Sequence, residues 1–589
     1  MNLNSTNSAP PYTNWITAAT NIQDAVDASS MGDFIVVSNG TYNTGGRAVY
    51  GTSTNRLAVD KAVTVESVNG PGSTVIVGNY DIRCVYLTNG ASLIGFTLKN
   101  GAVISSANNP TNQDCGGGVW CESVSTTVSN CVLTYNLAYK NGGAAYQGTF
   151  NNCIISNNTA VMGGAGTYQA NLNNCTVTRN HLQTDLSGGG GAAFGVLSNC
   201  LVIQNSAPNG GGTYFSTLNN CIVSNNYAHF GGGMCCGTIS NTIISGNTAK
   251  FYGGGALSNS LVNCLLIGNK ATNNTVNSFY GTYGGGAFQS SLINCTVMNN
   301  SSYTAGGGVC GGMLNNCMMM ANSAQTGGAV VAFSYDMPAI LNSCTIYGNS
   351  ASFGGGGLAS SGIWSTGSIY VTNCIVFGNT APSGSNYFGF ALFFRYCCTA
   401  PFPTTGIGNI TGDPQLVNPA GGDFRLQSNS PCINAGNNAY VFGTKDLDGN
   451  LRIVGDTVDI GAYEYQTPSS ILSYAWAQQY GLPTDGSVDY VDSDGDGLNN
   501  WQEWKARTIP TNAASVLLLA TPSNSVSGVT VTWQSVTNVI YYLQGSTNFA
   551  SQPAFFTIQS NIAGQIGTTS YTDIHATNGG PYFYRVGVQ

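Results

Sequence analysis

Charged side chains are scarce in this chain of 589 residues: Asp, Glu, Lys and Arg together make up 7% of it, and there are 3 His. The formal net charge of −8 argues against nucleic acids and anionic membranes as partners. No apolar run reaches the roughly 18 residues that a membrane-spanning helix needs. The opening stretch MNLNSTNSAPPYTN lacks the basic and apolar regions of a signal peptide. We therefore read the chain as a mature region, or a piece of a longer secreted protein, with neutral partners.

Glycine, by contrast, is abundant at 79 residues, and the chain is too long for one ordinary domain unless it is built from repeats. Segments such as LNNCTVTRNH, LSNCLVIQNSAPNGGGTYFST and LNNCIVSNNYAHFGGGMCCGT share one pattern, with a commonest step of 21 or 22 residues. An anchoring residue marks each copy: Cys131, Cys153, Cys175, Cys200, Cys221, Thr242, Cys264, Cys295, Cys317, Cys344 and Cys374. A period this short leaves no room for a crossover helix, so each copy must consist of short strands.

Fixed positions around the anchor show which side chains stack from copy to copy. Apolar residues stand three before and two after it, Asn stands five after it in every copy, and a second Asn column, broken only by Ser343, stands just before it. A Gly run follows, and then a further apolar column: Tyr146, Tyr168, Phe194, Tyr214, Cys235, Leu257, Phe288 and Cys310. Short β-branched runs between Gly and Asn turns are typical of strands. The sequence predicts an all-β fold, a right-handed parallel β-helix over residues 15–467, with stacked residues ~4.8 Å apart.

The Cys column has three interpretations: disulfides, a metal site, or buried free thiols. Thiols stacked along parallel strands form a line, whereas metal ligands converge on a point. A small buried hydrophobic side chain also suits a tight interior corner, so we favour free thiols. With 19 Cys at least one is unpaired, and a disulfide involving Cys115, Cys121 or Cys432 stays open.

The two ends of the repeat region have their own patterns. Residues 15–46 predict one amphipathic helix followed by a strand, and this helix would cover the open edge of the first coil. The segments DPQLVNPAGGDFRLQSNSPCINAG (413–436) and KDLDGNLRIVGDTVDIGAYEYQ (445–466) resemble the terminal segment of secreted bacterial β-helix proteins of the choice-of-anchor Q type. The Gly-Gly-Gly and VxxN signatures are similar to the repeats of polymorphic outer-membrane proteins. These resemblances imply a pectate-lyase-like fold and an extracellular location.

A calcium-binding loop is predicted after a short helical stretch, ILSYAWAQQYGL. DSDGDGLNNWQE (492–503) fits the twelve-residue EF-hand loop position by position, with Asp at 1, 3 and 5, Gly at 6 and Glu at 12. The expected ligands are Asp492, Asp494, Asp496, the backbone carbonyl of Leu498, Asn500 and Glu503. The loop resembles dockerin and thrombospondin type 3 segments. Because only one complete loop is present, we expect a structural clamp rather than a dockerin-like partner surface.

The chain thus divides into four predicted parts: a leader at 1–14, the β-helix at 15–467, the helix and calcium loop at 468–512, and a small β-sandwich at 513–589. In the last part VTVTWQSV, IYYLQGSTNF and PYFYRVGVQ alternate as strands do and resemble a fibronectin type III domain. We expect it to be a spacer or an accessory binding module.

Carboxylates are too sparse in the repeats for an obvious catalytic pair. Between Cys131 and Cys374 the acidic residues are Asp185 and Asp336, six coils and so roughly 29 Å apart along the axis, whereas a glycosidase needs two carboxyl groups within ~5–9.5 Å. Weak catalytic candidates remain at Asp114 with Glu122, beside Lys140, and at His181, which Asp185 would orient as a general base.

Aromatic and polar residues recur in the loops between the turn Asn and the Gly run. They predict a carbohydrate-binding edge of Tyr139, Lys140, His229, Phe230, Lys250, Phe251, Tyr252, Phe279, Tyr280, Tyr283, Tyr303 and Phe353. Aromatic faces suit sugar rings, although the same rings could instead pack under loops. We favour a non-catalytic, monomeric, extracellular module that binds a plant-type polysaccharide. It is similar in architecture to β-helical modules joined to xylanases, with xylan as the first guess. The alternatives are a polysaccharide lyase or glycoside hydrolase, and an adhesin or surface-structural repeat protein.

Overall fold

The chain folds almost entirely from short strands. The computed structural model describes residues 1–49, 53–104, 113–184, 188–273, 281–334, 337–360, 367–577 and 579–588. Its contacts divide the chain into two units, one of residues 1–371 with 376–393 and one of residues 372–375 with 394–589. The α-helices are α1 (Ile22–Ala28), α2 (Tyr474–Gln479) and α3 (Asn500–Ala506). Within the described ranges no helix has the length and apolar character needed to cross a membrane.

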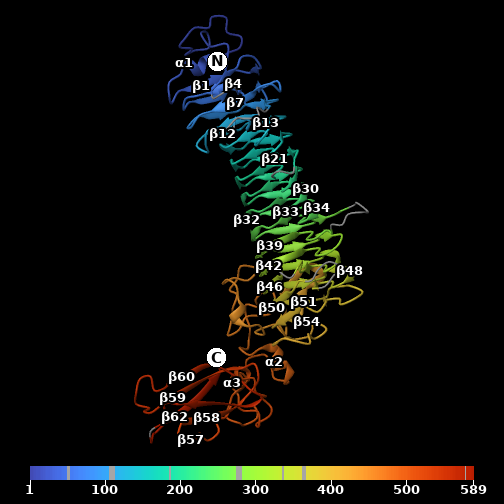
Figure 1. Cartoon of the computed structure of the whole chain (residues 1–589), viewed down its shortest axis with the longest axis vertical. Helices are drawn as coiled ribbons and strands as arrows, with labels where there is room; N and C mark the ends of the chain where they lie inside the picture. Colours follow the sequence, from blue (N-terminus) through green and yellow to red (C-terminus); the bar gives the residue numbers. More distant parts are fainter. Residues whose placement is uncertain are drawn as a thin grey trace. The chain divides into compact units, whose positions relative to one another are not determined.

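The first unit is a right-handed parallel β-helix, as the sequence predicted. Its coils stack into three parallel sheets (Figure 1). In this unit sheet A includes the strands from β1 (Phe34–Val37) to β52 (Tyr387–Phe388), and sheet B includes those from β2 (Gly40–Tyr42) to β47 (Thr345–Tyr347). Sheet C runs from β10 (Ala102–Val103) to β48 (Ser350–Gly354). A typical coil passes through all three: β19 (Thr167–Tyr168) and β20 (Asn171–Asn173) in A, β21 (Thr176–Thr178) in B and β22 (His181–Leu182) in C.

The predicted apolar columns form the interior of the coils. The column three residues before each anchor Cys is buried, as in Phe150, Leu172 and Leu197, and so is the column two residues after it, as in Ile155 and Val177. In-register pairing places these residues directly above one another: Phe150 pairs with Leu172, and Ile155 with Val177. Because each coil contacts only its neighbours, the hydrophobic core is continuous along the solenoid.

The cysteines are free thiols, as expected, including Cys115, Cys121 and Cys432. The anchor column is buried in the interior, and each anchor thiol lies close to the backbone amide of the preceding coil. The amide of Cys153, for example, points at the sulfur of Cys175 at 3.4 Å. The column is therefore a line of small apolar side chains at the corner between sheets A and B.

A buried Asn ladder closes the turn between sheets B and C. The side-chain oxygen of each Asn accepts from both the backbone amide and the side-chain amide of the Asn one coil earlier. Asn226 Oδ1, for instance, accepts from Asn205 N at 2.9 Å and from Asn205 Nδ2 at 3.0 Å. Asn226 Nδ2 in turn donates to Val202 O and to Asn247 Oδ1. The same pattern runs from Asn136 to Asn379. This ladder gives hydrogen-bond partners to polar groups that are buried in the turn.

The second Asn column and the Gly run serve the other two turns. Asn174 and its equivalents adopt φ near +54° between sheets A and B, a left-handed conformation that Asn tolerates. The Gly run brings the chain from sheet C to sheet A with backbones in close contact. A Cβ on Gly211 would lie 2.4 Å from the carbonyl oxygens of both Gly232 and Tyr227, so only glycine fits.

Helix α1 covers the first coil. Asn21 caps the helix by accepting from the amide of Asp24, and the helix buries its own residues Ile22, Ala25 and Val26. The side chain of Gln23 pairs with both backbone groups of Ala58, accepting at 2.9 Å and donating at 3.0 Å. The helix thus satisfies backbone groups of β4 (Thr54–Val59) that an open sheet edge would expose.

The second unit contains the terminal segment, the helical segment and a β-sandwich. Strands β57 (Ser523–Ser525), β58 (Gly528–Ser535) and β61 (Gly567–Asp573) form one antiparallel sheet, and β59 (Ile540–Ser546), β60 (Phe556–Ala563) and β62 (Phe583–Val588) form the other. Trp533, Tyr541 and Leu543 lie in their shared core. Residues 394–467 have most of their contacts within this unit.

Buried carboxylates hold the terminal segment, consistent with a turn-supporting role. Asp459 accepts from the amides of Asn434 and Tyr465, and Glu464 accepts from those of Val454 and Asp459 and pairs with Arg452 at 3.4 Å. Burial raises the pKa of Asp459 to about 7. Burial and the charge of Asp459 raise the pKa of Glu464 to about 9.

These carboxylates should make the second unit less stable as the pH rises. Their folded-state pKa values lie above the ordinary values of about 4, so the stabilisation is complete in acid and is lost as the pH rises through about 7 to about 9. We expect Glu464→Gln to destabilise the protein more at about pH 5 than at about pH 9, because the amide resembles the protonated acid. Chemical denaturation in the presence of chelator measures the free energy of unfolding of wild type and variant at both pH values. An equal loss of stability at the two pH values would contradict the prediction.

Candidate functional sites

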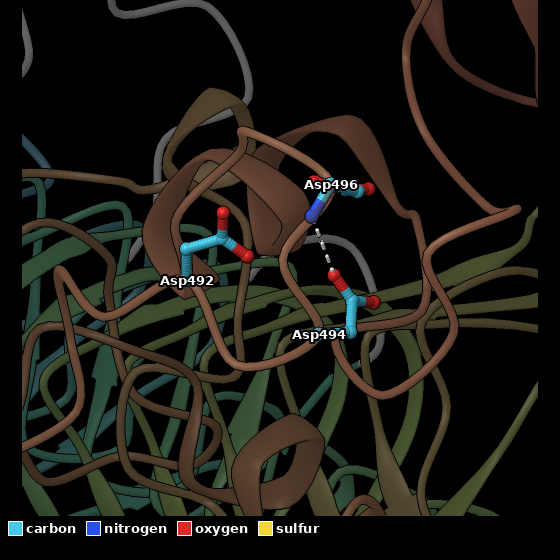
Figure 2. A group of neighbouring side chains, drawn as sticks. All are labelled: Asp492, Asp494 and Asp496. Atoms are coloured by element: carbon cyan, nitrogen blue, oxygen red, sulfur yellow. Dashed lines mark hydrogen bonds between the residues drawn. The ribbon is translucent and has the colours of Figure 1, made fainter.

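The predicted calcium loop follows α2, and its last four residues form the start of α3. The carboxylate of Asp492 accepts from the amide of Gly495 at 2.7 Å and from that of Gly497 at 2.9 Å. Gly497 has φ +96°, the conformation that the sixth loop position requires. One carboxylate oxygen from each of Asp492, Asp494 and Asp496 lies within 4.8 Å of the others. Figure 2 shows these three side chains and the bond from the amide of Asp496 to Asp494 Oδ1.

Four buried oxygens of this loop have no hydrogen-bond donor: Asp494 Oδ2, Asp496 Oδ2, Asn500 Oδ1 and Glu503 Oε2. Asn500 and Glu503 are fully buried. The amide nitrogen of Asn500 donates to Val488 O and Ser493 Oγ, which fixes its oxygen as the free group. Burial, and then the charges of Asp494 and Asp496, raise the pKa of Glu503 to about 7. Buried oxygen acceptors without donors are the ligand set that a hard cation such as Ca²⁺ takes.

The weak catalytic pair at 114 and 122 is divided between different partners. Asp114, at the entry to β11 (Val119–Cys121), is buried and forms an ion pair with Lys140 at 2.8 Å. Glu122, at the exit of β11, accepts from Tyr86 Oη, Thr88 Oγ1 and the amide of Asn89. The contacts of the two weak candidates therefore differ: Asp114 pairs with a cation, whereas Glu122 accepts from three donors of the preceding coil.

The histidine candidate lies on sheet C. His181 Nδ1 is 2.8 Å from Ser206 Oγ one coil onward. Asp185, its expected orienting partner, lies outside the described residues, as does Asp336. The described part of this loop therefore shows a polar pair between neighbouring coils.

The predicted carbohydrate-binding edge follows sheet C. His229 and Phe230 lie in β30 (Tyr227–Phe230), and Lys250 and Phe251 in β34 (Thr248–Tyr252); these four are half-buried. The aromatic rings of neighbouring coils contact each other, with 5.3 Å between the centroids of Phe230 and Phe251. Lys250 Nζ lies 5.2 Å from the centroid of the Phe251 ring. Tyr139, Tyr303 and Phe353 are exposed, Lys140 is held by Asp114, and Phe279 and Tyr280 lie outside the described residues.

Two of the predicted edge residues instead pack against other aromatic rings of the β-helix. Tyr283 is buried against Phe333, with 5.0 Å between ring centroids. Tyr252 stacks on Phe288 at 4.9 Å and 13°. These rings cover the outer side of sheet A as a satellite cluster with Cys310. Tyr283 therefore offers no face to a ligand, because its neighbours from other coils enclose it.

An aromatic ladder lies on the outer face of sheet A, where the sequence predicts an apolar column. Parallel register stacks Tyr86, Trp120, Tyr146 and Tyr168 on successive coils. The centroid separations are 5.4, 6.1 and 5.9 Å, with interplanar angles of 11° or less. Residues one position earlier, such as Val119 and Ala145, are fully buried in the core, so the rings point outward. We define the aromatic ladder as Tyr86, Trp120, Tyr146, Tyr168, Phe194, Tyr214 and Phe215.

The ladder reaches the surface at its far end. At Ala193 the column has no ring, and Phe194 fills the place from the next position, 5.3 Å from Tyr168. Phe194 then stacks on Phe215 at 5.5 Å and 6°. Phe194 is 41% and Phe215 49% exposed. The repeat of aromatic residues in the sequence was visible, but their outward direction was not.

Comparison with solved structures finds low overall similarity. The chain is similar to pectate lyase Pel9A at 14% identity and a TM-score of 0.24, over 79% of this chain and 95% of that one. It is similar to PfbA, a surface adhesin of Streptococcus pneumoniae, at 9% identity and a TM-score of 0.27, over 64% of this chain and 89% of that one. It is also similar to a mannuronic acid specific polysaccharide family 6 lyase from human gut microbiota, at 10% identity and a TM-score of 0.27. This match covers 65% of this chain and 86% of that one. At these scores the similarities carry no argument about function. No protein-family model and no curated protein matches the chain.

Proposed function

We propose that this chain is a non-catalytic, extracellular carbohydrate-binding protein whose β-helix holds a plant-type polysaccharide. The observation that carries the proposal is the row of half-buried and exposed aromatic rings along sheet C, where Phe230 and Phe251 stand beside His229 and Lys250. Rings with one apolar face and polar neighbours suit pyranose rings, whose C–H groups pack on the face while hydroxyls bond nearby.

Two features favour binding over catalysis. Glu122 accepts from three donors, and Asp114 is paired with Lys140. The repeats from Cys131 to Cys374 contain only Asp185 and Asp336 as acids. We further propose a monomer that is part of a longer multidomain secreted protein.

The calcium loop belongs to the same proposal as a structural element. Asp492, Asp494, Asp496, the Leu498 carbonyl, Asn500 and Glu503 would hold one Ca²⁺. The ion would supply positive charge to buried oxygens that have no donor. Helix α3, which carries Asn500 and Glu503, is tied to the terminal segment by Lys505, 2.7 Å from Asp456, and by Trp501 Nε1 to the same carboxylate. The loop would thus clamp the second unit.

Titration of the full chain against xylan, glucomannan and mixed-linkage β-glucan tests the proposed function. We expect saturable binding without release of reducing ends, and a loss of about threefold to tenfold in affinity for Phe251→Ala. Phe556→Ala, which removes an exposed ring on β60 outside the β-helix, is the matched control. Binding to no polysaccharide would overturn the proposal, and reducing ends that disappear in Glu122→Gln would assign an enzyme.

A further inference from the structure

We infer that the outer face of sheet A, along the exposed half of the aromatic ladder, is a second binding track and that its ligand is a neutral polysaccharide running along the solenoid axis. The inference rests on the proposed function and adds a surface and a ligand class to it. The track consists of Tyr168, Phe194, Tyr214 and Phe215, with the amides Gln147 and Gln169 leading into it.

The spacing of the rings matches an extended chain of sugars. Successive ladder centroids lie 5.3 to 6.1 Å apart, since each ring stands one coil above the last. This is close to the length of one pyranose residue in an extended glycan, so neighbouring sugars would meet neighbouring rings. Phe194 and Phe215 are parallel to within 6° and expose nearly half of their surface. Because the two rings stack face to face, they form an apolar ridge along the coils, against which the C–H groups of an extended sugar chain can pack.

Polar groups line the same face at the same intervals. Gln147 and Gln169 precede Phe194 in one column, and Gln147 Nε2 donates to Gln169 Oε1 at 3.4 Å. Beside them, Asn171 of β20 and Thr217 of β28 (Thr217–Asn219) point outward, because Leu172 and Leu218 between them and the next outward residue are buried. These amides and hydroxyls can donate to and accept from sugar hydroxyls on either side of the rings.

The absence of charge selects the ligand class. From residue 186 to residue 249 the chain has no Asp, Glu, Lys or Arg, and none occurs between Lys140 and Arg179. A polyuronate would lose the hydration of its carboxylates on this face and gain no cation in return. A neutral glycan loses only hydroxyl hydration, which the amides replace. The same absence of charge disfavours a protein partner recruited by ion pairs.

The inference is tested with the full chain and defined polymers. Phe194→Ala and Phe215→Ala should each lower the affinity for a neutral polysaccharide about threefold to tenfold, with little change in melting temperature because both rings are exposed. Gln169→Ala should lower it less. Phe393→Ala is the matched control, since Phe393 is 46% exposed and stacks on Tyr370 at 5.2 Å elsewhere on sheet A. Polygalacturonate and alginate should bind more weakly than the neutral polymers.

The outcomes separate this inference from the proposed function. If wild type binds neutral glycans and both Phe variants bind equally well, the track is wrong while the proposed function stands. Stronger binding of polyuronates than of neutral polymers overturns the neutral ligand. If Phe215→Ala changes the sedimentation coefficient instead of the glycan affinity, Phe194 and Phe215 join two copies of the chain and the inference fails. Wild type that binds no glycan overturns both proposals.

Discussion

Chelation of calcium should lower the melting temperature of the second unit by about 10 °C. The expected size follows from an ion present at about a thousand times its dissociation constant, which stabilises the folded state by about 4 kcal/mol. The physical reason is the set of four buried oxygens at Asp494, Asp496, Asn500 and Glu503 that have no donor. A divalent cation offsets their repulsion and their lost hydration.

Glu503→Gln distinguishes an ion site from a merely structural carboxylate. The variant should lose the calcium-dependent increase in melting temperature. Without calcium it should be at least as stable as wild type, because an uncompensated buried acid next to Asp494 and Asp496 is removed. Asp485→Asn, an exposed acid outside the loop, should keep the full calcium response. Calorimetric titration should give one ion per chain; identical melting of wild type with calcium and with chelator would refute the site.

Asn226→Ala should destabilise the β-helix by about 3–5 kcal/mol. The substitution removes the oxygen that accepts from Asn205 N and Nδ2, and the amide that donates to Val202 O and Asn247 Oδ1. A buried donor or acceptor that loses its partner costs about 1–3 kcal/mol, and Asn226 is 1% exposed. The loss therefore exceeds that of an ordinary surface substitution.

Asn219→Ala is the matched control for the ladder. Asn219 is exposed on the outer face of β28 and accepts one bond from Asn241 Nδ2, so its loss should cost about 0.5 kcal/mol or less. Native-state hydrogen exchange should show faster exchange centred on the coils around Asn226, because each coil contacts only its neighbours. Uniformly faster exchange, or a cost equal to that of Asn219→Ala, would contradict the ladder's role.

Much of the fold could be predicted from the sequence because the sequence is repetitive. A residue in a solenoid contacts the equivalent residue one repeat away, so columns in the sequence become ladders in space. The Asn at five after each anchor, the Gly runs and the Val and Leu columns were predictable for this reason. The spacing of Asp492, Asp494, Asp496 and Glu503 was equally readable, because one continuous loop supplies every expected ligand.

The direction of the aromatic column was decided only by the tertiary structure. Alternation in a strand separates two faces but does not say which is inside when both carry apolar residues. Tyr146 and Tyr168 read as packing residues, yet their strand neighbours Ala145 and Thr167 fill the core instead. Tyr283 read as a surface ring, yet Phe333 from two coils onward encloses it.

The sequence by itself thus determined the β-helix and its turns and predicted the calcium loop, since these depend on contacts at a fixed separation along the chain. Only the tertiary structure decided which rings are exposed, that Glu122 is held by Tyr86, Thr88 and Asn89, and that Asp459 and Glu464 lock the terminal segment. Those contacts join residues from insertions and turns of unequal length, and no period in the sequence relates them.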